Sequence, residues 1–177
     1  MPTHVNLRWT EMEAAMAGAR KLQALASQYG ITDIFSDNGG KVAQIAVAVG
    51  LDIVSGRTGA DATDRLGNEY ELKTVDIDKK ARGFSTSHHL NENTIAKYRR
   101  RRFVFGIYEG IVLKEVYLVE AGSMDPIFQA WESRLRSGKT HLNNPKIPLD
   151  FIREIGITMY LKDVAPSWAS GKEKAAA

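Results

Sequence analysis

The stretch DATDRLGNEYELK (61–73) decides the predicted fold, because it ends in a strand pattern that carries charge on one face. Polar and apolar residues alternate through EYELKTVDI (69–77), which is typical of a β-strand. Side chains two positions apart on a strand point to the same face. We therefore expect Glu71 and Lys73 to project together, while Leu72 faces the core.

Asp61 would join this pair if a turn at 65–67 folds the chain back alongside the strand. Oxygen ligands of this kind suit Mg²⁺, which takes one or two protein carboxylates and keeps other positions for water and phosphate. The ion would polarise a phosphoryl oxygen and acidify a bound water, which Lys73 could orient or deprotonate. An exposed strand face is the alternative, because a Glu-x-Lys pattern is common. The motif alone leaves both interpretations open.

The N-terminal segment predicts a long amphipathic helix. Thr10 and Glu13 have the spacing of a capping box, and Gly30 supplies a stop signal. Between them, apolar residues recur at steps of three or four, namely Trp9, Met12, Met16, Ala19, Leu22, Leu25 or Ala26, and Tyr29. Packing on its own domain and contact with a second copy are equally good ways to bury this stripe.

The rest of the chain mixes the two kinds of element. Further helices are expected at 41–50, 92–100, 123–138 with Ser123 as its cap, and 148–155. Extended structure is expected within 51–68, in a hairpin of 103–110 and 111–120, and at 157–161. Strict βαβ alternation is missing, so we predict an α/β fold with a mixed central β-sheet flanked by helices. We expect one domain over 1–161 and a flexible tail over 162–177.

Composition narrows the class of protein. The chain has 177 residues, 44% of them hydrophobic, with no cysteine, which suits a globular domain without disulfides or thiolate chemistry. No apolar run approaches the roughly 18 residues needed to cross a bilayer. The N-terminus lacks the basic-then-apolar pattern of a secretory signal. We expect a soluble protein of the cytoplasm.

Positive charge is concentrated around Tyr98, where Lys97 is followed by four consecutive arginines at 99–102. The net charge is only +3, so the distribution carries more information than the total. A basic patch of this kind can meet a phosphate backbone. An ordinary solvated surface is the alternative.

Two polar loops carry side chains that suit base recognition. His88 and His89 could donate to guanine O6 and N7, and Asn143 and Asn144 could each bind adenine bidentately. The histidines could instead bind zinc, but the chain offers neither cysteine nor His-x₃-His spacing. Each loop alone also fits an ordinary turn.

The loops and the carboxylates together resemble the PvuII family of type II restriction endonucleases, within the PD-(D/E)xK nuclease superfamily. The resemblance runs in order over about residues 21–160. Its matching stretches are GITDIFSDNGGK (30–41), GNEYELKTVDID (67–78), GFSTSHH (83–89), IAKYR (95–99) and NNPKIP (143–148).

This resemblance implies a restriction-endonuclease-like fold, an N-terminal dimerisation helix, and Mg²⁺-dependent hydrolysis of double-stranded DNA within the palindrome CAGCTG to blunt ends. Its implied catalytic residues are Asp61, Glu71, Lys73 beside the attacking water, and Tyr98 near the scissile phosphate, with Asp61, Glu71 and Leu72 as metal ligands. The implied DNA contacts are His88 and His89 to G·C pairs, Asn143 and Asn144 to adenine, Ser85 in the recognition loop, and Asp37 toward the minor groove. A homodimer and a host DNA methyltransferase for the same site are the implied partners.

The chain departs from the family pattern at two places. Ser87 stands where the family has a third histidine, and Thr58 stands where it has an acidic residue near the metal. Two alternatives therefore stay open, namely an endonuclease with an altered site, and a sequence-specific DNA-binding protein that has lost catalysis.

Overall fold

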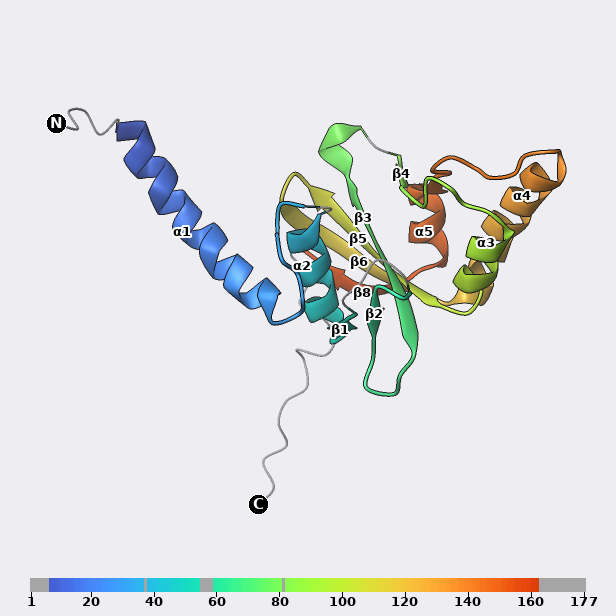
Figure 1. Cartoon of the computed structure of the whole chain (residues 1–177), viewed down its shortest axis with the longest axis horizontal. Helices are drawn as coiled ribbons and strands as arrows, with labels where there is room; N and C mark the ends of the chain where they lie inside the picture. Colours follow the sequence, from blue (N-terminus) through green and yellow to red (C-terminus); the bar gives the residue numbers. More distant parts are fainter. Residues whose placement is uncertain (1–6, 37, 55–58, 81, 163–177) are drawn as a thin grey trace, which may run out of the picture.

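A six-stranded sheet forms the centre of the computed structural model, which describes residues 7–36, 38–54, 59–80 and 82–162 (Figure 1). The strands lie in the order β1 (Asp52–Ile53), β2 (Ala62–Thr63), β3 (Glu69–Asp76), β5 (Arg102–Glu109), β6 (Val112–Val119) and β8 (Ile157–Leu161). The β3–β5 pair is parallel and the other neighbouring pairs in this sheet are antiparallel. A second, two-stranded sheet joins β4 (Gly83–Phe84) to β7 (Ile147–Pro148). The predicted mixed sheet is confirmed.

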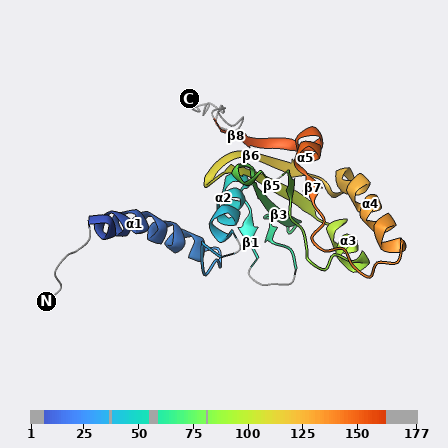
Figure 2. The ribbon, with the colours of Figure 1, turned by 90° about the horizontal axis from the view of Figure 1, so that it is seen from above.

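Helices cover both faces of the large sheet (Figures 1 and 2). On one face, α2 (Gly39–Val49) packs its Ile45 and Ala46 against Leu72 and Val104. On the other face lie α3 (Glu92–Tyr98), α4 (Asp125–Arg136) and α5 (Leu149–Ile155), which contribute to the larger apolar core. Short 3₁₀ turns follow β3 at Ile77–Lys79 and precede α4 at Ala121–Met124.

The parallel pairing of β3 and β5 fixes the middle of the molecule. Every residue of β5 from Phe103 to Tyr108 is buried, as expected for a strand covered on both faces. Gly106 lets α2 approach closely, because a Cβ there would lie 2.6 Å from Cγ2 of Ile45. β3 lies between β2 and β5 in this sheet. Its side chains, Glu71 and Lys73 among them, are therefore held in fixed positions.

Among the described side chains of the N-terminal helix α1 (Leu7–Ser27), those of its last turns join the core. Ala26 is buried against Ile34 and Ala43, whereas Met12 and Leu25 are 57% and 48% exposed. Figures 1 and 2 both show the helix projecting from the rest of the molecule beside α2. Among the described helices, none combines the length and apolar character that a membrane crossing requires.

Two predicted helix starts are wrong. α1 already begins at Leu7, so Thr10 lies inside the helix and does not cap it. α4 begins at Asp125 with Met124 in the capping position, so Ser123 falls in the preceding 3₁₀ turn. Pro126 accounts for the second shift, because proline favours the first turn of a helix and fixes where it starts.

Candidate active site

The turn that was predicted to fold Asp61 back against β3 is present, and Asp64 builds it. One carboxylate oxygen of Asp64 accepts from the backbone N–H groups of Leu66 and Asn68, each at 2.9 Å. The other accepts from the Asn68 side chain at 2.7 Å and from the Tyr70 hydroxyl at 3.0 Å. These hydrogen bonds, the Asn68 side chain first, lower the pKa of Asp64 to about 2. The backbone N–H of Asp61 then donates to the carbonyl of Tyr70 at 3.0 Å.

The carboxylates of Asp61 and Glu71 converge on the ammonium group of Lys73. Nζ of Lys73 donates to Oε1 of Glu71 at 2.7 Å and lies 3.6 Å from Oδ2 of Asp61. Asp61 is oriented by the backbone N–H of Leu72, which donates to its Oδ2 at 2.8 Å. The Glu71 side chain is 8% exposed and that of Asp61 is 40% exposed, so the cluster is open on the Asp61 side.

Lys73 carries its positive charge in this arrangement. Burial alone would lower the pKa of Lys73, but the carboxylates of Glu71 and Asp61 outweigh it and hold the pKa above its ordinary value. One positive group therefore already sits between the two carboxylates, which shows that both can face a cation. Leu72 has a buried apolar side chain, so only its backbone carbonyl could act as the third predicted ligand.

The donors present suit Mg²⁺ better than a metal that needs a complete protein cage. Over the described ranges, no group of three or more histidine, cysteine, aspartate or glutamate side chains is arranged to hold a metal ion. Two carboxylates and a carbonyl leave room for water and phosphate oxygens, as Mg²⁺ prefers.

Tyr98 ends α3 on the same side of the sheet as Glu71 and Lys73. It is 5% exposed, and its ring packs edge-on against Phe103 with the centroids 5.5 Å apart. Burial raises the pKa of Tyr98 to about 12, with Lys73 opposing the shift and the carboxylates of Glu71 and Asp61 adding to it. The phenol is therefore neutral near pH 7 and available as a hydrogen-bond donor.

Most of the arginine run does not form the predicted basic surface. Arg99 pairs with Asp125 and Glu132, and Arg102 pairs with Glu120. Lys97 and Arg100 are exposed. Intramolecular ion pairs use the charges of Arg99 and Arg102 within the fold, and no sequence pattern indicated these pairs.

Arg101 is a site residue that the sequence interpretation missed. Its Nη1 donates to Oε2 of Glu71 at 3.2 Å and to the carbonyl of Gly59 at 2.8 Å, and its Nε donates to Glu69 at 2.9 Å. The side chain is 9% exposed. Both oxygens of Glu71 are thus held, one by Lys73 and the other by Arg101. The available signal for this contact was the pair Glu69 and Glu71, at alternate positions of one strand, together with the arginines at 99–102 that lead into another strand.

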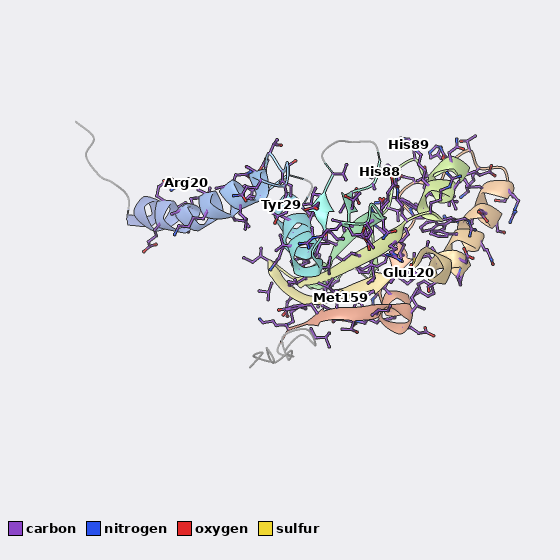
Figure 3. The ribbon with its side chains drawn as sticks, turned by 90° about the horizontal axis from the view of Figure 1, so that it is seen from below. Arg20, Tyr29, His88, His89, Glu120 and Met159 are labelled. Carbon is purple, nitrogen blue, oxygen red and sulfur yellow. The ribbon has the colours of Figure 1, made fainter. Side chains whose placement is uncertain are left out.

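The two predicted base-reading loops lie side by side, because β4 and β7 pair and Leu90 forms a bridge with Leu142. Nδ1 of His88 lies 3.2 Å from Oδ1 of Asn143. Figure 3 shows His88 and His89 together at one edge of the molecule. Both histidines and Asn143 are exposed, so their polar atoms can be reached by a large ligand.

Further hydrogen bonds, from backbone and side chains, join the two loops. Oδ1 of Asn144 accepts from the N–H of Thr86 at 2.8 Å, and the N–H of Asn144 donates to the carbonyl of Ser87 at 3.0 Å. Lys146 donates to the hydroxyl of Ser85 at 2.6 Å. The loops therefore form one joined surface. Asp37 and Thr58 lie outside the described residues.

A basic cavity of about 410 Å³ lies between β3 and the loops. Its wall includes three residues of β3 (74–76) as well as Ser85 from the loop after β4. Four cationic side chains line it, namely Lys41, Lys79, Arg82 and Lys146, and Lys41 pairs with Asp76, which also lines the cavity. Clustered cations of this kind suit a polyanion such as a nucleic-acid backbone.

Comparison with known proteins agrees with this combination of site and surface. A family model described as Restriction endonuclease PvuII matches residues 7–160, which is most of the chain. The match includes the carboxylate cluster, Tyr98 and both loops. The chain therefore belongs to the PvuII restriction endonuclease family, and it is a type II site-specific deoxyribonuclease.

Proposed function

We propose that this endonuclease is a Mg²⁺-dependent homodimer that cuts double-stranded DNA within CAGCTG and leaves blunt ends. The observation that carries the proposal is the convergence of Asp61 and Glu71 on Lys73. Restriction endonucleases typically use a divalent metal. Asp61, Glu71 and the carbonyl of Leu72 would hold it, and when bound it would polarise the phosphate and acidify a water.

The chain's own residues supply the remaining chemistry. Lys73, charged and held between two carboxylates, would orient the attacking water and offset negative charge as it builds up on the phosphorus centre. Tyr98, neutral near pH 7, would donate a hydrogen bond to a phosphate oxygen. Water attacks phosphorus in line with the scissile bond, and the 3′-oxygen leaves. No covalent enzyme intermediate is needed.

Base recognition is assigned to the joined loops. His88 and His89 would read the G·C pairs, Asn143 and Asn144 would read adenine, and Ser85 would contact the DNA from the recognition loop. Asp37 is proposed to reach the minor groove. The contact between His88 and Asn143 supports this proposal, because the two loops proposed to bind the bases meet each other there.

A palindromic site calls for a two-fold symmetric protein that places the same loops on each half-site. The unburied face of α1 supports this. An apolar cavity of about 780 Å³ lies between α1 and the segment that leads into α2, and its lining includes Leu22, Leu25, Tyr29 and Phe35. Figure 3 shows Tyr29 where α1 meets the rest of the molecule and Arg20 farther out along the helix. We assign α1 and this cavity to the dimer contact.

The dimer assignment makes a direct prediction. Leu25→Asp places a charge on an exposed apolar position that our account buries between subunits, so the protein should sediment as a monomer. Lys21→Asp, on the same helix and outside this lining, is the control and should leave the dimer intact. Sedimentation velocity measures both. A wild-type protein that is monomeric at micromolar concentration would contradict the assignment.

The proposed setting follows from the activity. One domain over residues 1–161 would carry the whole site, with 162–177 as a tail outside it. Such an enzyme would act in the cytoplasm, where a methyltransferase of the same specificity would protect host DNA.

A panel of duplexes that each differ from CAGCTG by one base pair tests the specificity. We expect Mg²⁺-dependent cleavage of CAGCTG at the central step, and much slower cleavage of the other duplexes. Ser87 supports the second candidate, an altered site, because it stands where the family pattern has a third histidine that could contact a base. Equal cleavage of another sequence would support that candidate over CAGCTG.

A further inference from the structure

Arg101 divides the carboxylate of Glu71 into two unlike oxygens. Oε1 faces Lys73, whose ammonium group also reaches Asp61, so this oxygen lies on the side where the two carboxylates meet. Oε2 accepts from Nη1 of Arg101 at 3.2 Å. Glu71 therefore offers one oxygen to the shared side and turns the other toward a guanidinium group.

The guanidinium group is fixed in this place by its other partners. Nε donates to Glu69 and Nη1 also donates to the carbonyl of Gly59, two residues before Asp61. The side chain is 9% exposed, so water offers little competition for these contacts. Arg101 thereby joins β3 to the segment that carries Asp61, and it cannot leave Oε2 without losing several hydrogen bonds.

The contact between Arg101 and Oε2 of Glu71 affects which divalent ion the site binds more tightly. Ca²⁺ takes six to eight oxygens and often binds both oxygens of one carboxylate, whereas Mg²⁺ is octahedral and takes single oxygens at shorter distance. A cation bound to both oxygens of Glu71 would have to approach the guanidinium charge and share Oε2 with it. Coulomb repulsion in a buried site opposes that approach.

We propose that Arg101 makes Glu71 a one-oxygen ligand and thereby biases the site toward Mg²⁺ and against Ca²⁺. The inference rests on the metal site of the proposed function. Arg101 is a positioning residue, because it acts through Glu71 and touches no reacting atom.

Binding of the metals alone to the full chain tests the inference without any measure of cleavage. Titration calorimetry with MgCl₂ and with CaCl₂ gives the ratio of the two dissociation constants for wild type and for Arg101→Gln. We expect this ratio to shift toward Ca²⁺ by about fivefold or more in the variant. If Arg101 had a purely structural role, Arg101→Gln would weaken the binding of both ions alike. If it acted only through its charge, the variant would bind both ions more tightly and to the same degree. An unchanged ratio of dissociation constants therefore overturns the inference.

Two further variants make the experiment decisive. Arg101→Lys keeps the positive charge but has a single side-chain nitrogen, so it should shift the ratio in the same direction by less. This variant replaces Arg101→Gln in the test if circular dichroism shows that Arg101→Gln does not fold. Arg102→Gln is the matched control, because Arg102 pairs with Glu120 and the Tyr70 hydroxyl, and its ratio should stay that of wild type. Wild type that binds neither ion would overturn the proposed metal site itself, whereas normal wild-type binding with an unchanged ratio would overturn only the role of Arg101.

Discussion

The carboxylate cluster and the loops proposed to read the bases are built in opposite ways. Glu71 and Lys73 lie on a central strand, mostly buried, with each polar atom held by a charged partner. His88 and Asn143 lie on exposed loops that are joined to each other by a few hydrogen bonds. Groups that stabilise a transition state work best when they are positioned and desolvated beforehand. Groups that read base edges must reach into a groove. The two regions therefore meet different physical requirements within one chain.

The largest effect is expected from a substitution in the carboxylate cluster. Lys73→Ala removes the charge that we propose offsets the developing phosphorane, so single-turnover cleavage should fall by at least about 10²- to 10³-fold. Binding of a CAGCTG duplex, measured in EDTA, should stay close to that of wild type because the loops are untouched. The rate constant and the dissociation constant are measured on the same preparation.

Lys79→Ala is the matched comparison, because Lys79 lines the basic cavity and lies outside the carboxylate cluster. This variant should weaken DNA binding and reduce its salt dependence, with little change in the single-turnover rate constant at saturation. If Lys73→Ala cleaves at more than a tenth of the wild-type rate, Lys73 is not part of the chemistry.

The second effect tests the loops. Asn144→Ala should lower discrimination at the adenine by about 1–3 kcal/mol, because the amide that we propose reads the base is lost. It also removes the acceptor for the Thr86 N–H and places alanine at φ 46°, a conformation that asparagine tolerates better. The ratio of cleavage rates for CAGCTG and a duplex changed at the adenine measures the effect.

Asn144→Asp separates the two roles of this side chain. It keeps an oxygen for Thr86 and lacks the amide donor, so it should lose discrimination with the loop intact. If discrimination survives in both variants, another residue reads that base.

The smallest expected effect concerns the turn that positions Asp61. The pKa of Asp64 is lowered to about 2 from an ordinary 3.8, so its stabilising contribution is present above pH 3.8 and is lost as the pH falls through about 2. Asp64→Asn should be less stable than wild type at pH 5, and the gap should narrow on acidification. Urea unfolding at several pH values between 5 and 2.5 measures it. A gap that stays constant over this range would show that the Asp64 carboxylate is not the group responsible.

Sequence pattern predicts those parts of the fold that have a period of their own. β3 and the β5–β6 hairpin alternate or run apolar over eight residues each, and both were predicted close to their observed bounds. β4 and β7 have two residues each, too short for any periodic signal, yet their pairing brings the loops together. That contact depends on tertiary packing, and no sequence pattern predicted it.

The same limit applies to the candidate site. Glu71 and Lys73 follow from strand geometry, and Asp61 follows from the turn residues at 65–67. The burial of Arg101 does not, since four consecutive arginines look alike in sequence. Their surroundings differ because the register of β5 against β3 pairs Arg102 with Tyr70. Arg101, one residue earlier, therefore lies beside Glu69 and Glu71.

Digestion of a supercoiled plasmid with a single CAGCTG site, in Mg²⁺ and in EDTA, tests the central claim most directly. We predict one Mg²⁺-dependent double-strand cut, with end sequencing that places blunt ends at the centre of the site. Cleavage at another sequence would contradict the assignment of the loops. Intact plasmid in Mg²⁺, with the protein folded and bound to the site, would contradict the chemistry assigned to Asp61, Glu71 and Lys73.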